Sequence, residues 1–352
     1  MAKVLMKGNE AIAEAAMKAG CKYFFGYPIT PQSEVPEYFA RELPKRNGCF
    51  LQAESEVAAI NMLYGASGAG ARVMTSSSSP GVSLMQEGIS YMAGANLPCV
   101  IVNMMRGGPG LGSIQPSQTD YFQSTRGGGN GDYRTPTYAP SSIQEMVDLT
   151  MKAFDVADKY RNPVFVIGDG MLGQMMEPVE FPEEDIDPST LPYKDWAADG
   201  QVSKRGHRNI INSLYLSADE LEAENKERAK KYQQIVENEV MVETTDLEDC
   251  DIVLSAYGTI ARICKTAKAA LEEEGIKVGI IRPITLWPYP YDAFKDLKCK
   301  DILVVEMNLG QMIDDVKIAV EGKQKVHFYG RQGGEIPVAD EIVEEVKKIL
   351  GR

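Results

Sequence analysis

Four short segments of this sequence carry residue types that could do chemistry. They are residues 26–31 (Gly-Tyr-Pro-Ile-Thr-Pro), residues 54–56 (Glu-Ser-Glu), residues 75–81 (Thr-Ser-Ser-Ser-Ser-Pro-Gly) and Arg106. Each follows a run of strand-like residues and precedes a helix-like or glycine-rich run. Because ligands of parallel α/β sheets bind at the carboxyl ends of the strands, we expect the four segments to line one cleft.

Two of these segments carry hydroxyl groups that could bind an anion or a carbonyl group. Two prolines stiffen residues 26–31, so Thr30 can present its hydroxyl at the edge of the strand. The hydroxyls and backbone N–H groups of residues 75–81 could bind an anion at the start of a helix. Each segment also has a purely structural interpretation: Thr30 as a helix N-cap in a rigid turn, and residues 75–81 as a polar loop with an N-cap.

The charged candidates are Glu54, Glu56 and Arg106. Glu56 directly precedes the apolar residues 57–60 and so lies beside the buried side of the expected helix; if it is buried, it could donate or share a proton. Alternatively, both acids simply interact with the positive end of the helix dipole. Arg106 has a planar fork that suits a carboxylate, and the glycines after it permit close approach, although a loop arginine is often only a surface charge.

Composition and charge exclude several classes of protein. The 352 residues are 44% hydrophobic and 25% charged, typical of a folded chain of about two domains. The net charge of −13 argues against nucleic acid as a partner, and no apolar run is long enough to span a membrane, so we expect a cytoplasmic protein. Six widely spaced cysteines and two histidines exclude a self-contained zinc or iron–sulfur site. No metal site is therefore predicted in this chain. We expect a bound cofactor to supply any chemistry that side chains alone cannot perform.

The elements that must position these residues alternate between strand and helix. In the first half, strands are expected near residues 23–27, 50–53, 71–75, 98–103 and 164–167, and helices near residues 8–20, after Pro31, and near 55–68, 81–94 and 141–160. This alternation predicts a parallel sheet with helices on both faces. A glycine-rich stretch at residues 106–140 interrupts it, and structureless segments of this length are usually functional or disordered.

A second, smaller α/β domain is expected near the carboxyl terminus. Residues 177–200 are rich in proline and acids, as in a linker, and Ser217 and Glu220 form a capping-box pattern before a charged helix that runs to about residue 240. Strands then follow at residues 251–256, 278–282, 301–306 and 325–329, and helices near residues 259–274, 291–298, 311–320 and 338–349. We therefore divide the chain into residues 1–180, 181–245 and 246–352.

Residues 168–170 (Gly-Asp-Gly) are similar to the start of the metal- and diphosphate-binding motif of thiamine-diphosphate enzymes. That motif needs an asparagine further along the chain, and residues 192–200, where it should stand, contain none. We therefore expect the diphosphate and Mg²⁺ site to be missing from this chain.

Taken in order, the motifs resemble one enzyme family. Tyr-Pro-Ile-Thr-Pro at residues 27–31 is followed by Glu-Ser-Glu-Val-Ala-Ala from residue 54, by Thr-Ser-Ser-Ser-Ser-Pro-Gly from residue 75 and by Arg-Gly-Gly-Pro-Gly from residue 106. This order resembles the large, pyrimidine-domain subunit of the 2-oxoacid:ferredoxin oxidoreductases over nearly the whole chain. The resemblance implies a thiamine-diphosphate-binding pyrimidine-type domain at 1–180, a linker with a charged helix at 181–245 and a transketolase C-terminal-like α/β domain at 246–352.

The family resemblance also implies a reaction and a set of partners. The reaction is the CoA-dependent oxidative decarboxylation of a 2-oxoacid to an acyl-CoA and CO₂, with reduction of ferredoxin. Thiamine diphosphate would lie between this chain and a β-type partner subunit that holds the diphosphate and Mg²⁺. A γ-type subunit and a ferredoxin-like subunit with [4Fe-4S] clusters are the other implied partners, and activity would require the assembled complex.

Carried over by position, the resemblance assigns roles to residues of the four segments. Glu56 would hydrogen-bond N1′ of the pyrimidine ring and favour the tautomer that removes the C2 proton of the thiazolium, with Glu54 as the competing choice. Thr30 and Arg106 would hold the substrate carboxylate. The residues implied to contact the coenzyme are Tyr27, Pro28, Ile29, Thr30, Glu56, Ser78 and Ser79.

The resemblance further indicates a substrate. Members specialised for 2-oxoglutarate tend to follow Arg-Gly-Gly-Pro with Ser-Thr-Gly, whereas this chain has Gly-Leu-Gly at residues 110–112. That segment and Gly-Gly-Gly-Asn-Gly-Asp-Tyr at 127–133 look like the branched-chain type, which acts on 3-methyl-2-oxobutanoate. Related sequences carry histidine where Asn130 stands, so no role is assigned to Asn130.

Other functions stay open at this point. Within the family, the substrate could instead be 2-oxoglutarate or an aromatic 2-oxoacid. A non-catalytic interaction or regulatory subunit would keep the fold but bind no thiamine. A transketolase-like or decarboxylase enzyme would use the same coenzyme without depending on CoA or ferredoxin.

Overall fold

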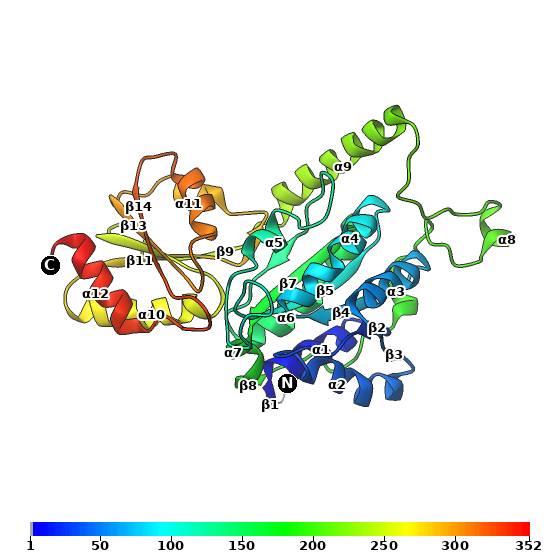
Figure 1. Cartoon of the computed structure of the whole chain (residues 1–352), viewed down its shortest axis with the longest axis horizontal. Helices are drawn as coiled ribbons and strands as arrows, with labels where there is room; N and C mark the ends of the chain where they lie inside the picture. Colours follow the sequence, from blue (N-terminus) through cyan, green and yellow to red (C-terminus); the bar gives the residue numbers. More distant parts are fainter. Residues whose placement is uncertain (1–2) are drawn as a thin grey trace.

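The computed structural model describes residues 3–352, which fold into a larger lobe and a smaller carboxyl-terminal lobe (Figure 1). The larger lobe is built on a seven-stranded sheet with the strand order β12-β6-β7-β5-β4-β2-β3. Its strands are β2 (Tyr23–Gly26), β3 (Cys49–Gln52), β4 (Val73–Ser77), β5 (Cys99–Met105), β6 (Thr137–Tyr138), β7 (Pro163–Asp169) and β12 (Thr285–Trp287). All neighbours are parallel except β12 and β6, so the parallel sheet predicted for this region is confirmed.

Helices cover both faces of this sheet. On one face α1 (Gly8–Lys18) packs against α6 (Ile143–Tyr160), with α2 (Glu34–Glu42) beside α1. On the other face α3 (Glu56–Gly68) packs against α4 (Ser79–Gly94). Every residue of β5 and β7 is buried, which is the pattern of parallel strands covered on both sides. The layered α/β architecture therefore follows from the continuous apolar runs in the sequence.

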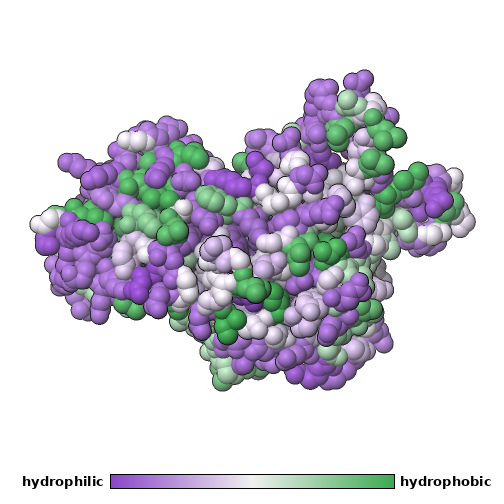
Figure 2. Space-filling view, viewed as in Figure 1, coloured by the Kyte–Doolittle hydropathy of each residue, from purple (hydrophilic) through white to green (hydrophobic). Residues whose placement is uncertain are grey.

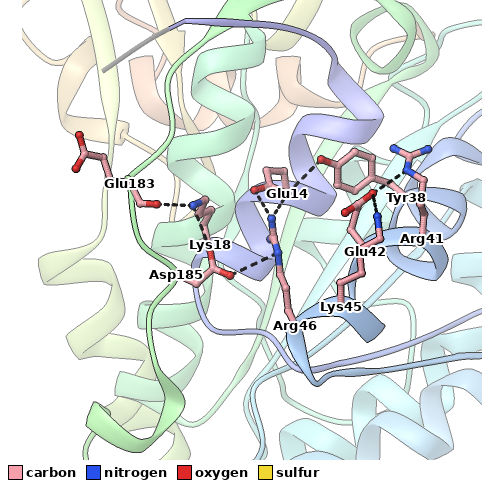
Figure 3. Close-up of polar contacts among 9 residues, drawn as sticks. All are labelled: Glu14, Lys18, Tyr38, Arg41, Glu42, Lys45, Arg46, Glu183 and Asp185. Atoms are coloured by element: carbon pink, nitrogen blue, oxygen red, sulfur yellow. Dashed lines mark hydrogen bonds and ion pairs between the residues drawn. The ribbon is translucent and has the colours of Figure 1, made fainter.

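A polar cluster holds α2 against α1 (Figure 3). The carboxylate of Glu14 accepts two hydrogen bonds from Arg46 Nη2, at 2.8 and 2.9 Å, and one from the Tyr38 hydroxyl at 3.2 Å. Lys18 forms an ion pair of 3.1 Å with Asp185, which ties a later segment of the chain to the same helix. The turn after β2 leads directly into α2. The contacts with α1 therefore hold the helix that follows this turn in place.

The smaller lobe contains a five-stranded sheet in the order β14-β13-β10-β11-β9. Its strands are β9 (Val242–Thr245), β10 (Ile252–Ser255), β11 (Val278–Pro283), β13 (Asp301–Glu306) and β14 (Lys325–Gly330). Only β9 runs antiparallel to its neighbour. One face is covered by α10 (Gly258–Glu273) and α12 (Ala339–Leu350), and α11 (Met312–Val320) covers the other.

The described chain contains several further elements, among them the long helix α9. They are β1 (Val4–Lys7) paired with β8 (Met176–Val179), the helices α5 (Tyr121–Thr125), α7 (Gly170–Gln174), α8 (Val202–Arg205) and α9 (Ala218–Asn238), and the 3₁₀ turns η1 (Pro44–Arg46), η2 (Pro188–Thr190) and η3 (Tyr291–Phe294). The amino-terminal end of α9 projects beyond the larger lobe, and the chain before it leads back to the extended segment that carries α8 (Figure 1). Apolar residues on the face drawn in Figure 2 form separate patches on both lobes. Nowhere in residues 3–352 is a helix both long and apolar enough to cross a membrane.

The two lobes are joined by buried charge as well as by shared apolar packing. Arg282 of β11 is 2% exposed and donates to both oxygens of Glu145 in α6, at 2.8 and 2.9 Å. The same guanidinium donates to Glu243 of β9 at 2.6 Å. Strand β12, which comes from the carboxyl-terminal half of the chain, joins the sheet of the larger lobe. These links hold the two lobes together.

Three expectations from the sequence were wrong in detail. Ser217 does precede α9, but its side chain makes no capping hydrogen bond, since this helix start is exposed and its N–H groups can bond to water. Residues 291–298 form only the short turn η3, because Phe294 is its one buried residue. The glycine-rich stretch at 106–140 is not structureless: it contains α5 and β6.

Candidate functional site

The four candidate segments lie at one edge of the seven-stranded sheet. Strands β5, β4, β2 and β3 are consecutive neighbours and all are parallel, so their carboxyl ends lie side by side. The segments that follow these ends contain, in the same order, Arg106, Ser78, residues 27–31 and Glu56. The structure therefore brings the candidates together at the edge where parallel sheets bind ligands.

Glu56 is the first residue of α3, and its side chain is turned inward. The helix begins here because Ser55 Oγ accepts a hydrogen bond from the N–H of Ala58 at 3.1 Å. Glu56 is 5% exposed, whereas Glu54 is exposed. Its carboxyl lies against the backbone of Gly81, where an added Cβ would stand 2.5 Å from Glu56 Oε1. Glycine at this position is what leaves room for the buried carboxyl.

The serines at the end of β4 differ in what their hydroxyls do. Ser77 and Ser78 are fully buried, yet neither hydroxyl has a hydrogen-bond partner among residues 3–352. Ser78 is the N-cap of α4 but makes no side-chain cap bond, and Ser77 Oγ would stand 2.1 Å from a Cβ at Gly81. Ser79 instead donates to Asp120 at 2.5 Å and accepts from the N–H of Arg106 at 3.0 Å. Two hydroxyls are thus buried without a partner among the described residues, and the third braces the site.

Asp120 and Asn103 complete this brace and were not singled out from the sequence. Asn103 Oδ1 accepts from the N–H of Ser79 at 3.0 Å, and its amide donates to Asp120 at 3.0 Å. Burial raises the pKa of Asp120, while hydrogen bonds from Ser79 and Asn103 oppose that rise. The available signal was the polar run at residues 117–120 inside a glycine-rich stretch, but the partners of that run lie on other strands.

Arg106 and Thr30 meet through the backbone of Thr30. Arg106 is 8% exposed, and its guanidinium donates to the carbonyl oxygens of Thr30 at 3.0 Å and Leu111 at 3.2 Å. Its Nε has no partner in the part of the chain that the structure describes. The Thr30 side chain is exposed. The interpretation of Thr30 as a helix N-cap is wrong, because Ser33 is the residue that precedes α2.

The remaining residues of the turn after β2 form the open side of the site. Tyr27 is 37% exposed, Pro28 is exposed and Ile29 is half-buried. Leu111, on the neighbouring glycine-rich loop, is 82% exposed. An apolar rim of this kind can contact a ring or a partner surface.

A cavity of about 630 Å³ adjoins the site between the two lobes. Its walls include Ser79 and Asp120 from the larger lobe and Asn308 from the smaller lobe. Gln118 joins these walls: its amide donates to the carbonyl of Tyr257 at 2.9 Å, and its Oε1 accepts from the N–H of Met307 at 3.0 Å. The glycine-rich loop is therefore held by both lobes.

Asn130 is not brought to this edge. Its side chain is exposed, and its carbonyl accepts a hydrogen bond of 2.6 Å from Ser90, in the second half of α4. The candidate serines lie at the opposite, amino-terminal end of the same helix. Among the described residues, no group of three or more His, Cys, Asp or Glu side chains is placed to hold a metal ion.

Comparison with known proteins identifies the family. Residues 14–241 match the family model described as pyruvate flavodoxin/ferredoxin oxidoreductase, thiamine diphosphate-binding, and residues 250–342 match pyruvate:ferredoxin oxidoreductase core domain II. The chain is 48% identical to ketoisovalerate oxidoreductase subunit VorB of Methanothermobacter thermautotrophicus, covering 100% of this chain and 99% of that protein. It is 38% identical to 2-oxoglutarate synthase subunit KorA of Methanocaldococcus jannaschii, covering 97% and 98% of the two chains.

A solved structure agrees with this assignment. The 2-oxoglutarate:ferredoxin oxidoreductase of Magnetococcus marinus, solved with 2-oxoglutarate, coenzyme A and succinyl-CoA bound, superposes with a TM-score of 0.88 at 28% identity. The match covers 98% of this chain, which spans only 65% of the length of the solved chain. The chain belongs to the 2-oxoacid:ferredoxin oxidoreductases, a family of oxidoreductases, and the resemblance drawn from its motifs is confirmed.

The site residues fit the ring of a thiamine coenzyme. The matched thiamine diphosphate-binding region contains Glu56, Gly81 and the two buried hydroxyls without partners. Gly81 with the Glu56 carboxyl and the Ser77 hydroxyl packed against it, which we call the glycine cradle, contains groups that could hydrogen-bond a flat, polar ring.

Proposed function

We propose that this chain is the coenzyme-ring subunit of an oxidoreductase that converts 3-methyl-2-oxobutanoate and CoA to an acyl-CoA and CO₂ and reduces ferredoxin. The observation that supports this most directly is the buried Glu56 carboxyl against Gly81, beside two unpaired serine hydroxyls. End-to-end similarity to a ketoisovalerate oxidoreductase subunit supports the substrate. We further propose that residues 1–180 bind the ring, 181–245 form the linker and 246–352 form the transketolase C-terminal-like domain.

In this proposal Glu56 holds a proton at a ring nitrogen of the bound coenzyme. The carboxyl is suited to this task because it stands at the start of α3 and is buried against the backbone of Gly81. The hydroxyls of Ser77 and Ser78 orient the ring through hydrogen bonds. Thiamine diphosphate supplies the electron sink that the decarboxylation of a 2-oxoacid requires.

Substrate binding falls to Arg106 and Thr30. The carbonyls of Thr30 and Leu111 hold the guanidinium in place, and its unpaired Nε, together with the exposed Thr30 hydroxyl, is proposed to bind the substrate carboxylate. Ser79 and Asp120 position Arg106 by holding its backbone. The exposed Leu111 is well placed for an apolar acyl chain.

The remaining components are assigned to partners that we propose for this chain. A β-type subunit would hold the diphosphate and Mg²⁺, and an iron–sulfur subunit would carry [4Fe-4S] clusters from which ferredoxin accepts electrons. A γ-type subunit would complete a cytoplasmic complex. The exposed rim of Tyr27, Pro28 and Leu111 is the surface that such a neighbour would cover.

The decisive test replaces Glu56 in the reconstituted complex. We expect Glu56→Gln to lower 2-oxoacid-dependent dye reduction by about 100-fold or more, since the ring nitrogen loses its proton donor. Glu54→Gln is the matched control, because this exposed acid stands two residues away. Co-purification of the partner subunits must be unchanged in both variants. Unchanged turnover in Glu56→Gln, with Glu54→Gln inactive or equally active, would overturn the assignment.

The substrate is tested by measuring turnover across a panel of 2-oxoacids. We expect the highest kcat/KM with 3-methyl-2-oxobutanoate and lower values with 2-oxoglutarate and phenylpyruvate. A preference for 2-oxoglutarate would instead support the activity of the KorA relatives. Activity without CoA or an electron acceptor would indicate a plain decarboxylase, and no thiamine binding at all would indicate a non-catalytic interaction subunit.

A further inference from the structure

Two cysteines of the smaller lobe, Cys250 and Cys299, lie side by side at the amino ends of strands β10 and β13. Strands β10 and β13 are parallel neighbours with Ile252 paired to Asp301, and Cys250 and Cys299 each stand two residues before that pair. Extending the register places the two cysteines opposite one another, on the same face of the sheet. Strand neighbours are about 4.8 Å apart, within the Cα separation that a disulfide needs.

The two cysteines also share one apolar cluster: Cys299 is buried in it and Cys250 packs against it. The Cys250 sulfur lies 3.1 Å from the position of a Cβ added at Gly279 of the neighbouring strand β11. The Cys250 thiol is 3.6 Å from the carbonyl of Leu247. The register therefore places the pair at a separation that a disulfide can bridge.

The two cysteines differ in exposure and acidity. Cys250 is half-buried, whereas Cys299 is only 8% exposed. The hydrogen bond from Cys299 lowers the pKa of Cys250 to about 7, against the effect of burial. The hydrogen bond to Cys250 and burial raise the pKa of Cys299. A small reagent can therefore reach the Cys250 sulfur, which ionises readily. Cys299 is shielded from the reagent and reacts most easily with Cys250.

We infer that Cys250 and Cys299 form a thiol–disulfide exchange site that takes a low-molecular-weight disulfide as its reactant. The Cys250 thiolate attacks one sulfur of the reagent, forming a mixed disulfide and releasing one small thiolate. The Cys299 thiol then loses its proton and attacks the Cys250 sulfur, which releases the second small thiolate and closes the Cys250–Cys299 bond. Two electrons pass from the protein to the reagent, which becomes two thiols.

The other cysteines supply internal controls. Cys21, Cys99 and Cys264 are at most 1% exposed, and burial raises the pKa of each. Cys49 is exposed on the edge strand β3 of the other sheet, in the other lobe. We expect Cys49 to form only a mixed disulfide, because its partner on the neighbouring strand is Tyr23 and the nearby Cys21 is buried. A Cys49→Ser background removes that signal.

The experiment treats the reduced complex, in the Cys49→Ser background, with oxidised glutathione and maps disulfides by mass spectrometry under non-reducing conditions. We expect one linked peptide pair joining Cys250 to Cys299, a chain lighter by two hydrogen atoms and no retained glutathione. Cys299→Ser should retain one glutathione at Cys250. Cys250→Ser should leave Cys299 a free thiol over the same time.

Several results would overturn the inference. They are a wild-type pair that stays reduced, a stable glutathione adduct at Cys250 with Cys299 free, or equal reactivity of Cys299 in the presence and absence of Cys250. A thiol count on each folded variant before treatment shows that the substitutions leave the three buried cysteines protected. Because the site lies away from Glu56 and Arg106, its failure or success does not depend on the proposed enzymatic function.

Discussion

The ends of β4 and β13, one strand from each sheet, carry buried polar groups that differ in their hydrogen bonding. In the larger lobe, Ser77 is the last residue of β4, and its buried hydroxyl has no partner within residues 3–352. In the smaller lobe, Glu306 is the last residue of β13, and its carboxyl is saturated. It accepts from the N–H groups of Met312 at 2.9 Å and Ile313 at 3.1 Å and from the Asn308 amide at 2.8 Å.

This difference distinguishes two strand ends, that of β4 from that of β13. A buried hydroxyl without a partner carries a cost that the fold itself does not offset, so a ligand is the natural source of the missing bonds. The Glu306 carboxyl already serves as the cap of α11, and burial, although opposed by these bonds, raises its pKa. The end of β4 thus leaves a hydroxyl for the proposed ligand, whereas the end of β13 stabilises the start of α11.

The largest effect is expected from filling the glycine cradle. Gly81→Ala would place a methyl group 2.1 Å from Ser77 Oγ and 2.5 Å from Glu56 Oε1, so both side chains must leave the positions proposed for ring binding. Turnover of the complex should fall about 100-fold or more, together with coenzyme binding. Gly65→Ala in α3 is the control: nothing lies within 4 Å of its added Cβ, and full activity is expected. Near-normal turnover in Gly81→Ala would remove the cradle from the site.

Removing the saturated carboxyl should affect stability instead. Glu306→Ala leaves the N–H groups at the start of α11 and the Asn308 amide unpaired, which we expect to cost about 2–4 kcal/mol in the free energy of unfolding. Glu344→Ala, at an exposed position on α12, should change that free energy by no more than about 0.5 kcal/mol. Denaturant unfolding of the full chain measures both. Equal stability of the two variants would contradict a structural role for the Glu306 carboxyl.

A smaller effect, on coenzyme binding rather than on stability, is expected at Ser78. Ser78→Ala removes a hydroxyl that has no partner in the described protein, so the free energy of unfolding should stay within about 0.5 kcal/mol of the wild-type value. The Kd for thiamine diphosphate in the complex should rise about 3- to 10-fold. Ser79→Ala provides the contrast, because it breaks bonds to Asp120 and Arg106 and should lower stability. A destabilised Ser78→Ala with unchanged coenzyme affinity would count against a ligand role.

The local part of this architecture could be predicted from the sequence. Strand 301–306 was predicted with the bounds that the structure has, because an apolar run between charged residues is a short-range signal. The apolar residues after Glu56 placed it beside the buried side of the expected helix but left its burial open, and the structure shows that it is buried. The order in which strands are followed by helices also sufficed to place the candidate segments at one edge.

What could not be predicted depends on pairs of residues far apart in the chain. Asp120 braces Ser79, and Gln118 contacts Met307, but neither partner is visible from local spacing. The contact between Arg106 and Thr30 uses a carbonyl oxygen, which every residue has, so no side-chain pattern marks it. Strand β12 joins a sheet formed mostly by residues more than a hundred positions earlier, and only the folded chain shows this.

The smallest predicted effect concerns the charged contact between the lobes. Burial acts to raise the pKa of Glu145, but hydrogen bonds from Arg282 and Ser141 hold it below the ordinary value of 4.5. An acid whose pKa is lower in the folded state stabilises the fold above its unfolded pKa, and this contribution is lost as the pH falls through the folded value. We expect the wild-type chain to lose about 1 kcal/mol more stability than Glu145→Gln between about pH 5 and pH 3. Unfolding at several pH values tests this, with Asp148→Asn on the same helix controlling for the loss of one exposed negative charge. Parallel pH profiles for wild type and Glu145→Gln would show that the carboxyl linking the lobes behaves like a solvated one.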